Sequence, residues 1–107
     1  MSSLDDRGRG EEAKYAFDAE KKFKAEVRRN KLLGAWAADL LGLTGDAATA
    51  YAAEVVAADF ERAGDSDVLD KVSADFKAKS VSVDDATIRQ KMDQLAIAAN
   101  EQVAAEG

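Results

Sequence analysis

Residues 23–42 read FKAEVRRNKLLGAWAADLLG, and this stretch decides the fold. Its apolar side chains recur mostly at intervals of three and four, which is the spacing of one face of a helix. They are Phe23, Val27, Leu33, Trp36, Ala37, Leu40 and Leu41. Gly42 follows them, and glycine is the residue that most often ends a helix in the left-handed conformation. We therefore expect a long first helix over roughly residues 14–42.

Three more helical stretches follow, separated by clusters of Gly, Ser, Thr and Asp that suit helix ends. Their apolar positions are Tyr51, Ala52, Val55, Val56 and Phe60 in the second, Leu69, Val72 and Phe76 in the third, and Ile88, Met92, Leu95, Ala99 and Val103 in the fourth. Ser82 with Asp85 resembles a capping box at the start of the fourth. Isolated helices are marginal in water, so these stripes must be buried against one another. The sequence predicts an all-α fold, a four-helix bundle.

The first eighteen residues differ from the rest because they carry few apolar side chains and many charges of both signs. Gly8 and Gly10 each disfavour a helix by about 1 kcal/mol relative to Ala. A segment of this composition cannot bury enough apolar surface to offset the entropy of ordering it. We therefore expect a flexible N-terminal segment over residues 1–18, mobile in the free protein and able to become helical on a partner, followed by the bundle over residues 19–107.

The amino-acid composition excludes most kinds of enzyme chemistry. Its 107 residues fit one domain, and they include no Cys, His or Pro. No disulfide can form, and a metal ion would have to be held by carboxylates alone. We expect a protein that is not an enzyme, with no metal site and no required cofactor.

The hydropathy pattern indicates where the protein is located. The start, MSSLDDRGRGEEAK, lacks the apolar run of a signal peptide or membrane anchor, and no apolar stretch approaches the ~18 residues that span a bilayer. We therefore expect a cytoplasmic protein without direct membrane insertion.

The net charge is −6, yet residues 1–31 hold nine basic and seven acidic side chains, whereas residues 32–107 hold six basic and fourteen acidic side chains. This asymmetry predicts a separate task for the N-terminal third.

A basic run lies inside the first helix, with KKFK at residues 21–24 and RRNK at residues 28–31. It could grip phosphate, RNA or an acidic protein. It could equally be a solvated helix face in which Glu20 and Glu26 pair with lysines one turn away. Nucleic-acid binding is disfavoured because the rest of the chain is acidic and few aromatic side chains are available to stack on bases.

Other candidates have simpler explanations. The carboxylate pairs at residues 5–6, 11–12 and 84–85 could suggest metal binding or acid–base chemistry, but adjacent helical residues point about 100° apart, and negative charge suits a helix start. Trp36 is expected in the core. Gly34 lies mid-helix, where it costs stability, so it indicates either close helix packing or a ligand near the backbone.

The residues from Asp5 to Gly42 carry a more specific likeness. RRNKLLG at 28–34, WAA at 36–38 and LLG at 40–42 are its most recognisable part, and further matches are Tyr51-Ala52, Val55-Val56, Asp59-Phe60, Gly64-Asp65, Asp67-Val68 and IRQKM at 88–92. Over essentially the whole chain, at consistent spacing, the sequence resembles the α-proteobacterial ATP synthase inhibitor zeta subunit family. The resemblance implies a four-helix bundle that inhibits ATP hydrolysis by the catalytic head of the F-type ATP synthase.

In such proteins the N-terminal segment is the inhibitory element, which implies insertion between the α and β subunits and arrest of the rotating γ subunit. The implied partners are therefore α, β and γ, at the cytoplasmic face of the inner membrane. Carried over by position, the inhibitory residues are Leu4, Asp5, Asp6, Arg7, Arg9, Glu11, Lys14, Tyr15 and Phe17. Gly8 and Gly10 stand near positions where the family more often has Glu and Ala, which raises the cost of ordering the helix by roughly 2 kcal/mol.

The resemblance also implies a regulatory adenine nucleotide, ADP or ATP. No phosphate-binding loop motif is present to hold it. We expect Arg28, Arg29 and Lys31 to meet the phosphates, with Trp36 nearby.

Two other interpretations stay open. One is a generic helical adaptor that binds another cytosolic complex through its N-terminal segment. The other is an acyl-carrier-like protein modified at Ser66, because Asp65-Ser66-Asp67 faintly resembles the Asp-Ser-Leu pattern of acyl carriers. A helix N-cap explains these three residues better.

Overall fold

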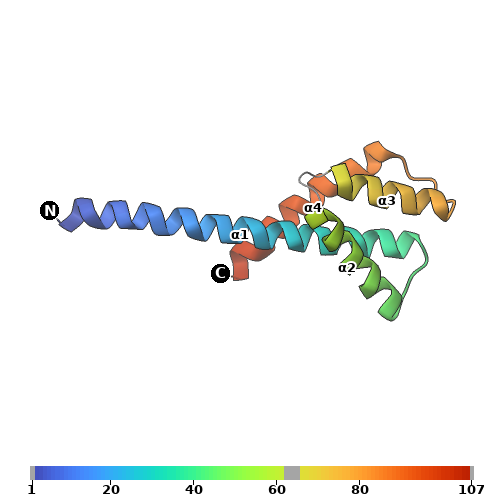
Figure 1. Ribbon diagram of the computed structural model, residues 1–107, viewed down its shortest axis with the longest axis horizontal. Coiled ribbons are helices and arrows are strands. Elements are labelled where there is room, and N and C mark those ends of the chain that lie inside the picture. The colour runs from blue at the N-terminus through green and yellow to red at the C-terminus, as the bar shows by residue number, and fades with distance from the viewer. Residues whose placement is uncertain (1, 62–65, 107) are drawn as a thin grey trace.

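The computed structural model describes residues 2–61 and 66–106, with side chains described for residues 19–59 and 67–106. It contains α1 (Ser2–Leu40), α2 (Gly45–Glu61), α3 (Ser66–Ala78) and α4 (Asp85–Glu106) (Figure 1). The described residues contain no strand. The predicted all-α, four-helix fold is confirmed.

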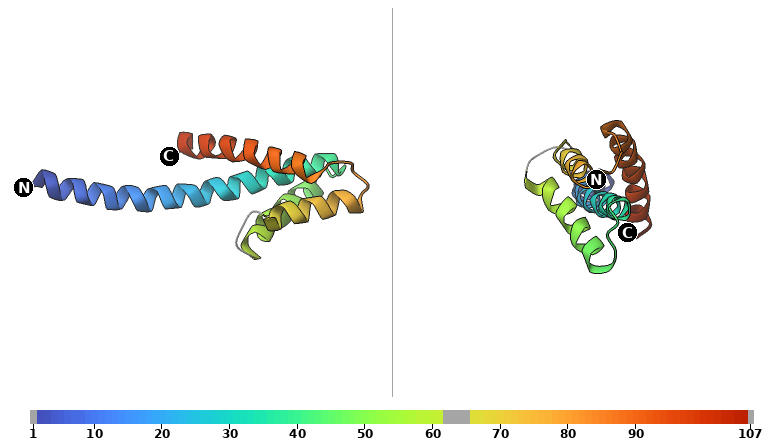
Figure 2. Two further views of the ribbon diagram at one scale, coloured as in Figure 1. Left: turned by 90° about the horizontal axis from the view of Figure 1, so that it is seen from above. Right: turned by 90° about the vertical axis from the view of Figure 1, so that its right-hand side faces the viewer.

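Helix α1 is the axis of the molecule and contacts each of the other three helices. Seen end-on, it lies between α2 and α4, with α3 closing the bundle (Figure 2). Its C-terminal half is enclosed by these neighbours, while its N-terminal part extends well beyond them (Figures 1 and 2). The molecule is correspondingly elongated, at 65 × 25 × 22 Å.

The first helix begins at Ser2, about twelve residues before the expected start near residue 14. The segment has no proline, and its Glu and Lys residues are good helix formers, which favours continuing the helix through two glycines. The side chains of residues 1–18 lie outside the described residues. Their expected mobility in the free protein therefore stays a prediction.

The core is formed largely by the stripes that the sequence predicted. In α3, Val68 was not predicted but is fully buried, whereas the predicted Leu69 is only partly buried. The side chain of the predicted Phe60 lies outside the described residues. Its largest fully buried side chains are Leu33, Val55, Val68, Val72, Phe76, Ile88 and Met92. Burying each of these apolar side chains stabilises the fold by roughly 1.5–3 kcal/mol. A smaller cluster of Ala25, Ala99 and Val103, with Leu32 against it, joins α1 to the last turns of α4.

Two members of the first predicted stripe are not buried. Phe23 is 53% exposed and Leu40 is 42% exposed, so their assignment to the core was wrong. Leu40 is the last residue of α1, where the chain turns away. Phe23 lies about 10 Å along the helix from Asn30, where the last turns of α2 reach α1, so α2 does not cover it.

Gly34 marks the closest approach of α1 and α2. A Cβ atom at this position would lie 2.5 Å from the Cα of Ala52 and 3.0 Å from its Cβ. Such distances leave no room for a side chain. Of the two sequence-based explanations for this glycine, close helix packing accounts for it.

The helix ends also follow local chemistry. Gly42 takes a positive φ of 78°, and the amide of Leu43 donates to the carbonyl of Ala38 at 2.8 Å, which ends α1 as predicted. The start of α4 differs from the prediction because Asp84, not Ser82, is the N-cap. The amide of Thr87 donates to Asp84 Oδ1 at 2.8 Å. Hydrogen bonding from the Thr87 side chain and from its backbone amide lowers the pKa of Asp84.

Candidate interaction surface on α1

All the candidate inhibitory and nucleotide-binding residues lie on α1. The proposed inhibitory residues are on the part of the helix that projects beyond the bundle, and their side chains lie outside the described residues; they are Leu4, Asp5, Asp6, Arg7, Arg9, Glu11, Lys14, Tyr15 and Phe17. Helix α1 is continuous from this projecting part into the bundle. The bundle therefore presents the N-terminal segment from one end (Figure 1).

Arg28 fixes the end of α4 against α1. Its Nη1 donates to Gln102 Oε1 at 2.9 Å, and its Nη2 forms an ion pair with Glu106 Oε2 at 2.6 Å. Beneath these contacts Val103 is buried against α1. The bundle therefore ends close to Arg28, and the helix that precedes residue 19 extends past it.

Arg29, the next residue, faces a different neighbour. Its Nε and Nη2 donate to Asn30 Oδ1 at 3.1 and 2.9 Å, and Asn30 Nδ2 donates to Asp59 Oδ2 at 3.0 Å. Arg29 is 8% exposed and Asn30 is 1% exposed. This buried polar network attaches the last turns of α2 to α1, because each buried group needs a hydrogen-bonding partner.

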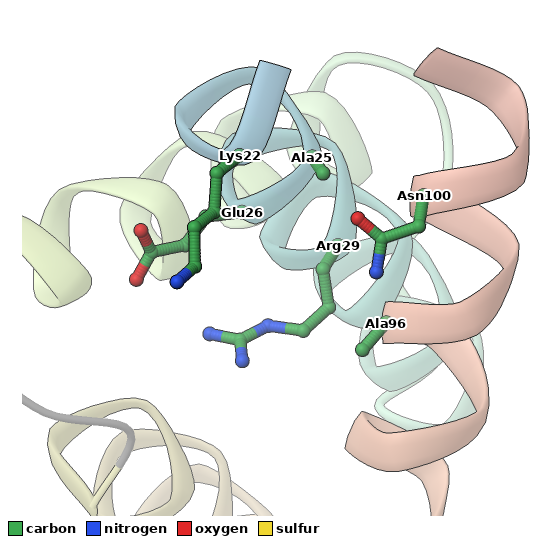
Figure 3. A pocket seen from close by; sticks show the side chains of 6 residues that line it. All are labelled: Lys22, Ala25, Glu26, Arg29, Ala96 and Asn100. Atoms are coloured by element: carbon green, nitrogen blue, oxygen red, sulfur yellow. The ribbon is translucent and has the colours of Figure 1, made fainter. Parts of the chain in front are cut away.

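Two recesses open on opposite sides of this stretch. The first, of about 250 Å³, is lined by Lys22, Ala25, Glu26 and Arg29 of α1 and by Ala96 and Asn100 of α4. In Figure 3, Lys22 and Glu26 lie together on α1, the guanidinium of Arg29 reaches the same space, and Asn100 faces it from α4. The second, of about 330 Å³, is lined by Phe23, Lys24, Val27, Arg28, Lys31 and Glu106.

The structure does not gather the four predicted nucleotide residues in one place. Arg29 lines the first recess, whereas Arg28 and Lys31 line the second. Trp36 lines neither. Its ring packs edge-on against Phe76 with ring centres 5.7 Å apart, and Lys91 Nζ lies 5.9 Å from its centre. No contact tests this assignment, which stays a prediction.

Sequence reasoning missed a polar cluster between α2 and α3. The Tyr51 hydroxyl donates to Asp75 Oδ2 at 2.8 Å, and Lys71 Nζ lies 3.1 Å from the same oxygen and 3.2 Å from Glu54 Oε1. Burial and the hydrogen bond to Asp75 raise the pKa of Tyr51 far above its usual range. Desolvation lowers the pKa of Lys71, but the hydrogen bonds to Asp75 and Glu54 outweigh it and raise the pKa overall. A tyrosine within an apolar stripe was the available signal, because its buried hydroxyl needs a partner.

Asp85, one of the paired carboxylates at residues 84–85, has a structural task. Asp85 Oδ1 accepts a 2.6 Å hydrogen bond from Ser73 Oγ and so joins α3 to the start of α4. Within the described part of the chain, no group of three or more acidic side chains is arranged to hold a metal ion. Across the same residues, no helix has the length and apolarity needed to cross a membrane. Ser66 begins α3, and its side chain lies outside the described residues.

A bundle that holds one long helix out from its end has the geometry of a helical protein-binding module. The comparisons with known proteins make this class specific. The family model for ATPase inhibitor subunit zeta matches residues 1–102. The chain belongs to the ATPase inhibitor subunit zeta family.

A solved structure supports the fold independently. A protein determined by solution NMR is 50% identical and aligns with a TM-score of 0.70, covering 80% of this chain and 98% of that protein. Comparison with curated protein sequences gives no match.

Proposed function

We propose that this chain inhibits ATP hydrolysis by the catalytic head of the F-type ATP synthase, and that the projecting part of α1 is the inhibitory element. It enters an interface between the α and β subunits and contacts γ, so that the central stalk cannot rotate. The chain acts without catalysing a reaction, and it works at the cytoplasmic face of the inner membrane, bound to the synthase.

The observation that carries the proposal is the extension of α1 beyond its bundle in a chain of the inhibitor family. Residues 2–18 add about 25 Å of helix at 1.5 Å per residue, which is the scale of a cleft between two protein subunits. Because the same helix continues into the bundle core, force on the inserted part is carried directly into a folded body. A short unanchored peptide would lack this support.

The charge distribution suits the same arrangement. The projecting residues carry both signs, which allows many polar contacts within a cleft, and the rest of the bundle is acidic and keeps the chain soluble outside it. Ordering a mobile segment on binding costs affinity, and a preformed bundle next to it limits that cost to the segment itself.

The test measures ATP hydrolysis by the isolated catalytic head with increasing amounts of the full chain. The full chain should suppress hydrolysis, and a variant lacking residues 1–18 should not, while retaining its helical circular dichroism spectrum. Ile97→Ala, an exposed change on α4, is the matched control and should inhibit like the full chain. Equal inhibition by the truncated chain would overturn the proposed mechanism.

The same preparations separate the alternative functions. If neither chain affects hydrolysis, capture of partners on the immobilised full chain tests the adaptor interpretation. The intact mass of the protein purified from its native cells tests the acyl-carrier interpretation, because an acyl carrier would show the added mass of a phosphopantetheine arm at Ser66.

We also propose that ADP or ATP binds the bundle as a regulatory ligand. The basic side chains on α1 support this. Of the four assigned residues, only Arg29 lines the first recess, whose volume of about 250 Å³ is smaller than that of most enclosed ligand pockets. Amide chemical shifts during an ADP titration test it. Chemical-shift changes at Arg28, Arg29, Lys31 and Trp36 would support their assignment to the nucleotide site, and unchanged shifts at these residues would exclude it.

A further inference from the structure

The second recess belongs to a surface that the proposed inhibitory mechanism does not use, although two of its residues, Arg28 and Lys31, are also assigned to the nucleotide. This surface, here called the Phe23 surface, consists of Phe23, Lys24, Val27, Arg28 and Lys31 of α1, with Glu106 of α4 at its edge. Its α1 residues lie within an arc of roughly 140° on the helix, at 100° per residue. They begin within two turns of the projecting segment, so both are parts of one continuous helix.

The Phe23 surface combines an exposed aromatic ring with a row of cations. Phe23 is 53% exposed, and Val27 lies one turn further along the same side. Lys24, Arg28 and Lys31 follow at spacings of four and three, which places them beside this apolar pair. Lys24 and Lys31 are both exposed, whereas Arg28 is held by Glu106 and Gln102. Aromatic residues and Arg are enriched in protein–protein interfaces, and cations beside an exposed ring favour a partner of opposite charge.

Charge identifies the chemistry of the occupant. Residues 19–31 contain six basic and two acidic side chains, whereas residues 32–107, which form the rest of the bundle, contain six basic and fourteen acidic. Positive charge is therefore concentrated on this stretch of α1. An extended polyanion such as a nucleic acid or a lipid surface would also meet the acidic bundle and be repelled by it. A compact acidic patch on a protein would meet only the basic stretch.

We infer that the Phe23 surface is a second docking surface for the partner of the projecting helix, and that it takes an acidic patch with an apolar hollow for the Phe23 ring. This rests on the proposed function, because the partner is the one that the N-terminal segment enters. The acidic patch lies at the mouth of that cleft, since α1 is continuous and the Phe23 surface follows the inserted part by one or two turns. The contact holds the bundle against the outer surface of the catalytic head and slows dissociation of the inserted helix.

The test uses the full chain and exposed positions only. Phe23→Ala should weaken binding to the isolated catalytic head about tenfold, the effect of a moderate hot-spot residue. Lys24→Glu with Lys31→Glu should weaken it by a similar factor at low salt and by less at high salt, because the attraction is screened. Inhibition of hydrolysis and the dissociation rate measured by surface plasmon resonance report both effects.

Matched controls isolate the surface from general effects. Lys77→Glu with Lys79→Glu changes the net charge equally on exposed residues in and just after the last turn of α3, and Ile97→Ala removes an apolar side chain that is more exposed than Phe23. Both should bind like the unmodified chain. Thermal unfolding of every variant should be unchanged, because none of these side chains is buried.

The outcomes are distinguishable. If truncation of residues 1–18 abolishes inhibition while the Phe23, Lys24 and Lys31 variants bind normally, the second docking surface is refuted and the proposed function stands. If the unmodified chain does not inhibit at all, both fail. Binding of the chain to phosphatidylglycerol vesicles that is lost in Lys24→Glu/Lys31→Glu, with normal inhibition, would assign the surface to lipid. Loss of self-association in Phe23→Ala, again with normal inhibition, would assign it to a second copy. Either result overturns the inference.

Discussion

Replacing Gly34 with alanine should destabilise the bundle, although alanine is the better helix former. Helix propensity alone predicts a gain of about 1 kcal/mol for this change. The new Cβ, however, would lie 2.5 Å from the Cα of Ala52, a backbone atom that no side-chain rotation can move. Ordinary carbon–carbon contacts need about 3.5–4 Å, so α1 and α2 must separate by about 1 Å.

That separation loosens the packing on both sides of the contact, where Leu33 and Val55 are fully buried. Overpacking of this kind costs about 1–3 kcal/mol. Set against the gain of about 1 kcal/mol in helix propensity, the free energy of unfolding should fall by up to about 2 kcal/mol. Urea unfolding followed by circular dichroism measures it, and the midpoint should fall by up to about 1 M.

Two companion variants sharpen the interpretation. Ala35→Gly, at the exposed neighbouring position, measures the helix-propensity term on the same helix and should cost about 1 kcal/mol. Ala52→Gly combined with Gly34→Ala removes the 3.0 Å contact to the Ala52 Cβ but leaves the 2.5 Å contact to Cα. Compared with Ala52→Gly alone, which has its own propensity cost of about 1 kcal/mol, Gly34→Ala should therefore still destabilise the bundle, but by less than in the original chain. A single Gly34→Ala variant that is more stable than the original chain would refute the close-packing argument.

Three further predictions follow from the hydrogen bonds and the N-terminal sequence. Asp59→Ala leaves the buried amide of Asn30 without its acceptor and should lower the free energy of unfolding by about 1–3 kcal/mol in urea titrations, with a smaller loss for Asp59→Asn. The pKa of Asp84 is lowered in the folded state, so its N-cap should stabilise the fold above the ordinary pKa of an aspartate, and this stabilisation should be lost as the pH falls below it. An Asp84→Ala variant should therefore show a smaller dependence of its thermal unfolding on acid pH. Gly8→Glu with Gly10→Ala should reduce the ordering cost by roughly 2 kcal/mol and strengthen inhibition of ATP hydrolysis up to about thirtyfold, and an unchanged inhibition constant would count against a helical N-terminal segment.

Periodicity was sufficient to predict the fold class, because the three-and-four spacing in each helix reports which side chains must be buried. The glycines at positions 42 and 34 were also interpretable, the first as a helix end and the second as either close helix packing or a ligand near the backbone. Position 34 shows how such a prediction arises. A glycine inside a strong helix costs stability, so a physical reason for it was expected, and the contact with Ala52 supplies that reason.

Sequence periodicity could not show where neighbouring helices stop. Phe23 belongs to the apolar stripe of α1 by spacing, yet α2 does not extend far enough along α1 to cover it. The hydrogen bonds between helices could not be predicted from the sequence for a similar reason. Asn30 with Asp59, and Tyr51 with Asp75, are 29 and 24 residues apart in the chain and meet only once the helices are packed. The N-cap of α4 was misplaced by two residues because Ser and Asp are equally suited to that position.

The account depends most on the projecting part of α1 being the portion that enters the catalytic head. A photo-crosslinking amino acid at position 17 of the full chain, compared with the same group at exposed position 97 of α4, tests this directly by mass spectrometry of the crosslinked complex. We predict crosslinks from position 17 to the α, β or γ subunit that disappear when unlabelled chain competes, and few or none from position 97. Crosslinks from position 97 alone, with position 17 silent while ATP hydrolysis is inhibited, would contradict the account.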